Sequence, residues 1–280
     1  DIDSFGQQPE AQQIMGLIGS FCLVKNEHLW IRSHILRVLP FVDEMVFFDG
    51  GSTDGTLEAI KDIQCGHLDG RKIKLFEGKV EKDLKDDYVR LFDECLHSLS
   101  TDLAFFLHPD MWVSNPERIP EAAKSDAIAL STDIESLAGN PGGQLYRIEG
   151  RGQKWKNIYR LRNPDLGAHY HGWYGAANED VYFREITGGR HDHYGAEFGK
   201  YPYPVQDSGI KVMHFSDVRT RERRMGRMVT CLVHQGYDQE TAKRIAEHHP
   251  RVTLDDGIGF KFTPVEYPDG FILGLAKVNA

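Results

Sequence analysis

Polar side chains that could bind a ligand follow two short apolar segments near the start of the chain. Asn26 and Glu27 stand where a strand over the apolar run 21–24 would end, with Lys25 between. Asp49 comes directly after a second apolar run, 45–48, and two glycines follow it. Glycine lets a ligand approach the backbone closely, and ligands of open α/β sheets lie beyond the carboxyl ends of the strands. The pattern therefore predicts a binding site where two neighbouring strands end.

The turn that opens at Asp49 reads DGGSTDGT and leads into a helical pattern. For its second half, 52–56, an ordinary turn between a strand and a helix is a sufficient interpretation. Thr53 or Asp54 is expected to cap that helix, because a short oxygen-bearing side chain accepts the free N–H groups of a first helical turn. Turn chemistry alone explains Asp49 poorly, because its carboxylate follows four apolar strand residues directly.

A second candidate site follows the most apolar segment of the chain, 103–107, which is expected to be a central strand. This segment runs into His108, Pro109 and Asp110, so a carboxylate would stand at the ligand face of the sheet. The alternative for Asp110 is a simple strand-end cap. His214 ends another apolar pattern, and a lone histidine in such a strand is more often a core residue than a ligand.

Four histidines in the middle of the chain allow a different chemistry. His169 and His171 would share one face of a strand, because side chains alternate, and such a pair can bind zinc. His191 and His193 flank an aspartate in a predicted loop. No further ligands follow at a characteristic spacing, so a zinc hydrolase is the less favoured alternative.

The first two motifs resemble the start of a GT-A glycosyltransferase of the family-two type. In that family one strand ends in Asn-Glu and the next ends in Asp-x-x-Ser-x-Asp-Gly-Thr, which this chain matches nearly residue for residue. The resemblance extends over residues 15 to 220 in four ordered motifs. It implies that these strand ends hold the nucleoside of a nucleotide-sugar. The residues concerned are Asn26, Glu27, Asp49, Gly50, Ser52 and Asp54.

The same resemblance implies a divalent metal, Mn²⁺ or Mg²⁺, that neutralises charge on the departing nucleoside diphosphate. Asp110 matches the last position of the metal-binding Asp-x-Asp motif, and His214 matches the histidine that completes the metal shell. His108 replaces the first aspartate of that motif, which departs from the family pattern. Imidazole is softer than carboxylate and suits Mn²⁺ better than Mg²⁺. His108 is thus a third candidate ligand, with contact to the ribose or diphosphate as its alternative.

The resemblance also implies the catalytic base, through the x-Glu-Asp motif of the family. In inverting members its aspartate removes the proton from the acceptor hydroxyl, which implies Asp180 as the general base and Glu179 as the second choice. The alternative is that both acids only favour the dipole of a helix N-terminus. Contacts to the donor or acceptor sugar are expected from Trp112, Gly172, Trp173 and Tyr174.

Composition limits the other possibilities. A net charge of −9 in 280 residues disfavours a nucleic-acid partner, because phosphate binding needs a basic face. No run approaches the ~20 apolar residues of a transmembrane helix. The scattered cysteines Cys22, Cys65, Cys95 and Cys231 are expected to be free thiols, which favours a reducing, cytoplasmic compartment. The arginines of 219–227 could contact a diphosphate, an anionic acceptor or a membrane surface, or form a solvated helix face.

The alternation of apolar strands and helical patterns predicts an α/β fold of the GT-A, Rossmann-like type. We expect a mixed, mostly parallel central sheet flanked by helices, with a helical C-terminal extension. The expected organisation is a flexible arm over 1–14, a catalytic domain over 15–218 and an extension over 219–280. The domain would comprise a nucleotide-binding half, 15–112, and an acceptor half, 113–218.

The favoured function is therefore a metal-dependent, inverting glycosyltransferase. Its donor would be a UDP- or GDP-sugar, and its acceptor a saccharide or glycolipid hydroxyl. A retaining transferase of the same fold is the nearest alternative, and the anomer of the product separates the two. A catalytically silent nucleotide-sugar-binding module is an alternative of another class, which donor hydrolysis would exclude.

Overall fold

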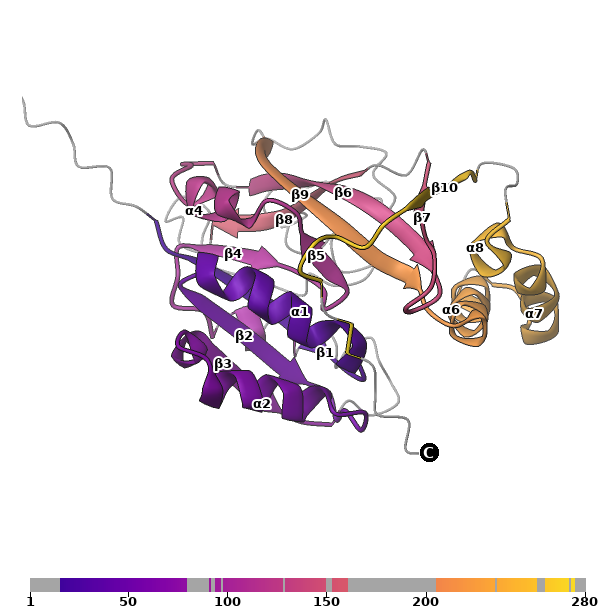
Figure 1. The fold of residues 1–280 in the computed structure, drawn as a ribbon, viewed down its shortest axis with the longest axis horizontal. Helices are drawn as coiled ribbons and strands as arrows, with labels where there is room; N and C mark the ends of the chain where they lie inside the picture. Colours follow the sequence, from indigo (N-terminus) through magenta and orange to yellow (C-terminus); the bar gives the residue numbers. More distant parts are fainter. Residues whose placement is uncertain are drawn as a thin grey trace, which may run out of the picture.

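The computed structural model describes residues 16–79, 91, 94–96, 98–127, 129–149, 153–160, 205–234, 236–255, 260–271 and 273–274. The predicted arm, 1–14, lies outside these residues. Figure 1 shows the described chain as one curved sheet with helices along it and a group of helices at one end.

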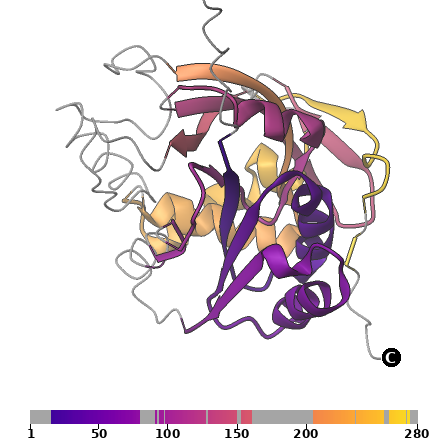
Figure 2. The same cartoon turned by 90° about the vertical axis from the view of Figure 1, so that its left-hand side faces the viewer.

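The N-terminal part alternates strands and helices as expected. Its elements are β1 (Ile18–Val24), α1 (His28–Val38), β2 (Glu44–Asp49), α2 (Thr56–Gly66) and β3 (Ile73–Glu77). All seven residues of β1 are buried, because the strand has a neighbour on each side and packing on both faces. Helices α1 and α2 lie together over one face of these strands, which the two views agree on (Figures 1 and 2).

The second part of the sheet is built from longer, partly antiparallel strands. Its elements are β4 (Leu103–Phe106), β5 (Met111–Val113), α4 (Ile119–Ala122), β6 (Ala129–Gly139), β7 (Leu145–Ile148), β8 (Gln153–Arg160) and β9 (Val205–Val218). β6 and β9 extend beyond their apolar stretches, because their polar residues continue the strand pairing.

The sheet order is β10-β7-β6-β8-β4-β1-β2-β3, with β9 paired to β6 and β5 paired to β9. Pairing is parallel within β4-β1-β2-β3 and between β6 and β9, and antiparallel elsewhere. β4 lies between β1 and β8, as expected for the most apolar strand. The predicted α/β class, with a mixed sheet flanked by helices, is confirmed.

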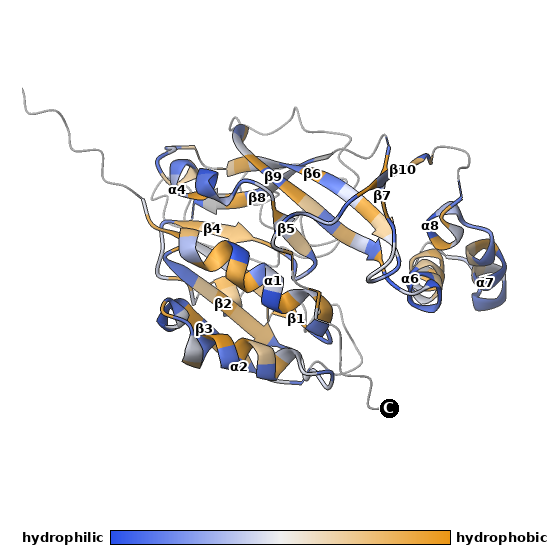
Figure 3. Cartoon of the chain, viewed as in Figure 1, coloured by the Kyte–Doolittle hydropathy of each residue, from blue (hydrophilic) through white to orange (hydrophobic). Residues whose placement is uncertain are grey.

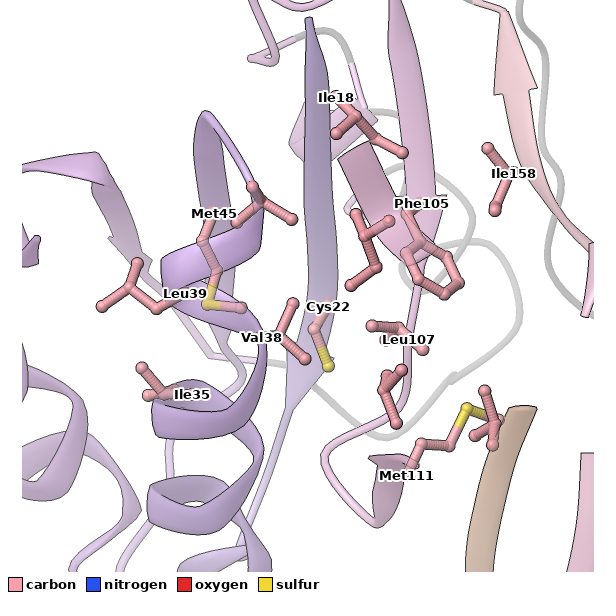
Figure 4. Close-up of a cluster of buried hydrophobic side chains, with 14 of the residues drawn as sticks. Ile18, Cys22, Ile35, Val38, Leu39, Met45, Phe105, Leu107, Met111 and Ile158 are labelled. Atoms are coloured by element: carbon pink, nitrogen blue, oxygen red, sulfur yellow. The ribbon is translucent and has the colours of Figure 1, made fainter. Parts of the chain in front are cut away.

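Alternating side chains of β1 divide the core into two layers. Ile18 and Cys22 join one apolar cluster with residues of α1, and Figure 4 shows this cluster around Met45 and Phe105. Phe21, between them in sequence, joins a second cluster on the opposite face. Figure 3 shows the resulting hydrophobic colouring of the central strands. Because both faces are buried, the strand ends rather than the faces are left to carry a site.

The four cysteines are free thiols, as the sequence indicated. Cys22 and Cys95 are buried in the two core layers, whereas Cys65 and Cys231 are exposed. None of the helices in the described ranges has the length and apolar character that crossing a bilayer requires.

Three helices follow β9: α6 (Arg221–His234), α7 (Gln239–Glu247) and α8 (Pro250–Thr253). Helices α6 and α7 share a small apolar cluster of their own. The chain then returns to the sheet, because β10 (Phe262–Val265) pairs antiparallel with β7. Phe271, further along the tail, packs against Trp30 of α1 with ring centroids 5.9 Å apart. The division at residue 218/219 into a domain and an extension stays a prediction.

Helix α7 begins after Asp238, and this cap offers a test of the C-terminal helices. Asp238 Oδ1 accepts hydrogen bonds from the backbone N–H groups of Glu240 (3.1 Å) and Thr241 (2.9 Å). We expect Asp238→Ala to lower the free energy of unfolding by about 1 kcal/mol, because it leaves those N–H groups without their acceptor. Urea denaturation followed by circular dichroism measures this. Gln239→Ala is the control, and equal stabilities of the two variants would contradict the capping role.

Candidate active site

The first two predicted motifs meet at one edge of the sheet. β1 and β2 are parallel neighbours, with Val24 in register with Asp49, so both strands end at the same level. The N–H of Gly50 donates to the carbonyl of Val24 over 2.9 Å. Asn26, Glu27 and Asp49 therefore stand side by side beyond the carboxyl ends of adjacent strands, where open α/β sheets bind ligands.

The loop after β1 is tied to the turn after β2 through Asn26. Asn26 has a φ of 57°, in the left-handed region that asparagine tolerates better than most residues. Its N–H donates to Ser52 Oγ over 2.9 Å, and its Oδ1 accepts from the N–H of Thr53 over 2.8 Å. Two motif side chains, Asn26 and Ser52, thus hold one loop against the other.

Asp54 and Thr56 complete this connection. Asp54 Oδ2 accepts from the N–H of His28 in α1, and Asp54 Oδ1 accepts from the N–H of Thr56, both over 3.1 Å. Thr56 Oγ1 accepts from the N–H of Glu27 over 2.8 Å. The predicted cap position is wrong by one or two residues, because the N-cap of α2 is Gly55 in the left-handed region. Asp54 still supplies the acceptor for the first N–H of the helix.

One carboxylate oxygen of Asp49 accepts hydrogen bonds from the turn, and the other does not. Its Oδ1 accepts from the N–H groups of Gly51 (2.9 Å) and Ser52 (2.7 Å), which shapes the turn. Its Oδ2 is buried, and it has no hydrogen-bond partner among the residues that the structure describes. A buried carboxylate oxygen without a donor is costly. This oxygen is thus suited to accept a hydrogen bond from a bound molecule.

β5 directly follows Asp110 and is held in place from two sides. His34 of α1 places its Nδ1 3.1 Å from the carbonyl oxygen of Met111, and Arg37 Nε donates to the carbonyl of Val113 over 2.8 Å. On the other side, β5 pairs antiparallel with β9, which sets Met111 opposite His214. The position of Asp110 is therefore fixed by both a helix and a strand.

The β5–β9 pairing brings Asp110 and His214 together, as predicted. His214 Nε2 lies 3.4 Å from Asp110 Oδ1, and the N–H of Phe215 donates to the carbonyl of Asp110 over 2.8 Å. The His108 ring is parallel to that of His214, with centroids 6.0 Å apart. Both histidines and Asp110 thus belong to one cluster, although 106 residues separate His108 from His214.

Arg219 joins this cluster to Glu27, in the loop after β1. Its Nη2 lies 3.1 Å from Asp110 Oδ2 and 3.8 Å from Glu27 Oε1. Its Nε donates to the carbonyl of Ser216 over 3.1 Å. The sequence analysis named Arg219 only as one arginine of a run that could contact a diphosphate, an anionic acceptor or a membrane surface. The available signal was its place in a basic run directly after a strand that ends in His214.

Electrostatics differ sharply between the two carboxylates. Burial alone would raise the pKa of Asp110, but the attraction and hydrogen bond of His214, together with Arg219, hold that pKa well below its usual range. Burial and the neighbouring charge of Asp110 raise the pKa of Glu27 from 4.5 to about 7, despite the opposing effect of Arg219. Burial lowers the pKa of His108 to about 4. At neutral pH, Asp110 is ionised and the His108 imidazole is neutral.

An aromatic side chain that the sequence analysis did not single out borders the histidines. Trp155 of β8 has its ring centroid 5.5 Å from that of His214 and 6.5 Å from that of His108, in both cases nearly edge-on. Phe106 lies on the other side of His108, with centroids 4.6 Å apart. This aromatic packing explains the burial that keeps His108 neutral.

Trp112 does not occupy the predicted sugar-binding position. It is only 4% exposed, and its ring packs against Phe271 with centroids 5.4 Å apart. Side chains alternate along β5, and Met111 is the cross-strand partner of His214. Trp112 therefore points to the face opposite His214 and is a core residue.

The basic run 219–227 is not a uniform surface patch. Arg224 is 5% exposed and donates to the carbonyl oxygens of Gly139, Arg219 and Val252. Arg227 donates to the carbonyl of Ser216 beside Asp110. Arg221, Arg223 and Arg227 itself are exposed. Three of the arginines thus bind groups of the protein itself, which weakens the expectation of a membrane-binding surface.

The remaining predicted site residues lie outside the described residues. They are the catalytic candidates Glu179 and Asp180, the sugar-contact candidates Gly172, Trp173 and Tyr174, and the histidines His169, His171, His191 and His193.

Asp110 and His214 fit a divalent metal. Metal–ligand bonds to nitrogen and oxygen are about 2.1 Å long, so two ligands of one ion lie roughly 3.0–3.4 Å apart. The separation of 3.4 Å between Nε2 and Oδ1 lies in this range. Within the described ranges, no group of three or more His, Cys, Asp or Glu side chains forms a metal site. The pair would therefore leave positions for water or phosphate oxygens, as Mg²⁺ sites usually do.

Comparison with known proteins gives structural likenesses alone. No family model and no curated protein matches the chain. The chain is similar to the mannosyltransferase PcManGT from Pyrobaculum calidifontis, solved with GDP-Man and Mn²⁺. The two are 13% identical over 86% of this chain and 74% of that chain, with a TM-score of 0.48.

It is also similar to residues 1–349 of TarS from S. aureus, at 13% identity over 82% of this chain and 69% of that chain, with a TM-score of 0.44. A third likeness is to glucosyl-3-phosphoglycerate synthase from Mycobacterium tuberculosis in complex with Mn²⁺ and UDP-glucose. It is 21% identical over 46% of this chain and 45% of that chain, with a TM-score of 0.31. At these identities and TM-scores, the likenesses assign no activity.

The raised pKa of Glu27 predicts a pH-dependent stability. The folded protein holds a proton on Glu27 up to about pH 7, whereas the unfolded chain releases it near pH 4.5, so stability falls as the pH rises between these values. We expect the free energy of unfolding of wild type, relative to Glu27→Gln, to fall by roughly 2–3 kcal/mol across this window. Urea denaturation at a series of pH values measures it.

Glu58→Gln, on the exposed side of α2, is the matched control for the loss of a carboxylate. A wild-type and Glu27→Gln difference that stays constant from pH 4.5 to pH 8 would contradict the burial of a protonated Glu27.

Proposed function

We propose that this protein is a glycosyltransferase that moves a sugar from a nucleoside-diphosphate sugar to a hydroxyl group, with a divalent metal bound at Asp110 and His214. The observation that carries the proposal is the convergence of three strand ends. Asp110 lies 3.4 Å from His214, and Arg219 connects it to Glu27 beside the Asp49 turn. A nucleoside at one end of this edge and a diphosphate at the other would span the two clusters.

Nucleoside recognition would rest on Asp49 more than on the other motif side chains. Asp49 Oδ2 has no partner among the described residues and is suited to accept a hydrogen bond from a base or ribose. The side chains of Asn26, Ser52 and Asp54 are engaged in hydrogen bonds between the two loops. Their contribution would be to hold the loops at the spacing that the ligand needs, and Gly50 allows close approach.

A metal at Asp110 and His214 would offset the charge that develops on the departing diphosphate. The low pKa of Asp110 suits a metal ligand, because the carboxylate stays ionised at neutral pH. The neutral imidazole of His108 lies beside His214 and would contact the diphosphate, because it forms no three-ligand group with Asp110 and His214. Mn²⁺ is favoured over Mg²⁺ because imidazole is the softer ligand.

We further propose an inverting, single-displacement reaction. Asp180 would remove the proton from the acceptor hydroxyl as its oxygen attacks the anomeric carbon of the donor sugar, with Glu179 as the second choice. Trp173 and Tyr174, with Gly172, would border the sugar. The proposed donor is a UDP- or GDP-sugar and the proposed acceptor a saccharide or glycolipid.

Donor binding should depend on metal through Asp110. With Mn²⁺ and UDP or GDP near 100 times their dissociation constants, ligand binding adds about 2.7 kcal/mol to stability. For a chain of this size we expect a rise of roughly 5–10 °C in melting temperature. Asp110→Ala should abolish the part of this rise that requires Mn²⁺. Thermal-shift assays with UDP-, GDP-, CMP- and dTDP-sugars, with and without Mn²⁺, measure it.

Asp62→Ala, which removes an exposed carboxylate of α2, is the control and should keep the full shift. A metal-dependent shift that survives Asp110→Ala would refute the metal site. The absence of a shift with every nucleotide-sugar in the wild type would refute the donor class.

The proposed base has a separate test. Asp180→Asn should leave donor binding intact and lower transfer by about 10²- to 10⁴-fold, because the acceptor hydroxyl would keep its proton. Rates of donor consumption with a panel of saccharide acceptors, together with NMR of the product anomer, measure both points. Transfer at the wild-type rate would show that Asp180 is not the base. A product with the donor's anomeric configuration would show a retaining reaction.

A further inference from the structure

Arg219 is the described cation that contacts both carboxylates of the site. Its Nη2 lies 3.1 Å from Asp110 Oδ2 and 3.8 Å from Glu27 Oε1, and its side chain is 14% exposed. The Nε edge of the guanidinium is held at the carbonyl of Ser216. The guanidinium is therefore fixed at one edge, and its other end faces the groups that a metal and a diphosphate would approach.

A metal at Asp110 would compete electrostatically with Arg219. The two oxygens of Asp110 face His214 and Arg219 respectively. Two positive charges within a few ångströms of one buried carboxylate repel each other strongly, because little water screens them. Metal binding would thus weaken the attraction between Arg219 and Asp110, and the guanidinium would keep only its 3.8 Å contact with Glu27 Oε1 among these two acids.

A second guanidinium stands at the same place. Arg227 Nη1 donates to the same carbonyl of Ser216 that accepts from Arg219 Nε. Arg227 also acts electrostatically on Glu27 and His108, so its charge reaches the cluster. Two guanidinium groups at one acceptor repel each other, and a nearby anion would stabilise this arrangement. Guanidinium binds phosphate oxygens through paired N–H donors, which suits it to a diphosphate.

We propose that Arg219 is a diphosphate-binding residue that exchanges partners. It pairs with Asp110 and Glu27 in the structure described here, and it transfers to the diphosphate of the donor when Asp110 and His214 take the metal. This inference rests on the proposed function. The consequence is that the metal binds better together with the nucleotide than alone. Metal alone must displace the ion pair between Arg219 and Asp110, whereas metal with the nucleotide provides Arg219 with a new partner. Arg219 thereby couples the two ligands.

Isothermal titration calorimetry of Mn²⁺ alone tests the first half of the exchange. Arg219→Ala should bind Mn²⁺ roughly 3- to 10-fold more tightly than the wild type, because the competing cation is gone. Arg219→Lys should bind Mn²⁺ close to the wild-type affinity. If Arg219 only orients Asp110 for the metal, Arg219→Ala would bind Mn²⁺ more weakly, and that result would overturn the proposal.

Titration of UDP and GDP at saturating Mn²⁺ tests the second half. Arg219→Ala should bind whichever nucleotide the wild type prefers about 10- to 100-fold more weakly, because a charged hydrogen-bond donor is lost. Arg219→Lys should recover part of this loss, since it keeps the charge without the paired donors. Unchanged nucleotide affinity in Arg219→Ala would overturn the proposal. Arg223→Ala removes an exposed arginine of the same segment and should leave both affinities unchanged.

The two hypotheses fail in different ways. A wild type that binds neither UDP nor GDP with Mn²⁺ refutes the proposed function, and the exchange with it. A wild type that binds nucleotide with metal, while Arg219→Ala binds Mn²⁺ no more tightly, refutes the exchange alone. Circular dichroism checks that each variant folds. If Arg219→Ala does not fold, Arg219→Gln, which keeps a hydrogen-bond donor without the charge, should show the same two changes in affinity.

Discussion

Two buried carboxylates at neighbouring strand ends are the constraint on which the rest of this site depends. Asp110 and Glu27 are withdrawn from water, and an isolated buried charge is too costly to persist. The fold meets this cost unequally: Asp110 receives both His214 and Arg219, whereas Glu27 receives the more distant contact from Arg219. Asp110 consequently stays ionised, and the pKa of Glu27 rises to about 7. One cation shared between two acids is an arrangement that a metal or an anion can readily change.

The loops at this edge are preorganised by their own side chains. Asn26, Asp54 and Thr56 connect the loop after β1 to the turn after β2, so that their polar groups satisfy backbone N–H donors. Several residues of the two motifs therefore act as supports, whereas Asp49 Oδ2 and Glu27 Oε2 are buried motif oxygens without a hydrogen-bond partner among the described residues. Such support reduces the entropy lost when a ligand binds, because the loops are already ordered.

Hydrophobic patterns predicted the buried strands well and the partly polar strands less well. β4 was recognisable because all four of its residues are buried and apolar. β9 begins at Val205, well before the apolar pattern that ends at His214, because Gln206 and Asp207 pair with β6 while their side chains remain exposed. Backbone pairing needs no apolar side chain, so an apolar run marks only the buried part of such a strand. Similar reasoning explains why β6 continues to Gly139.

The sequence alone determined which polar residues follow apolar strands, because strand ends and turns are local features. It thereby identified Asn26, Glu27, Asp49 and Asp110 as residues at the ligand edge. The tertiary structure decided the contacts among residues far apart in the chain: Arg219 between two acids, Trp155 beside the histidines, and Trp112 in the core. Those contacts depend on strand register, since a shift of one residue turns each side chain to the opposite face, and register is set by the packing of the whole sheet.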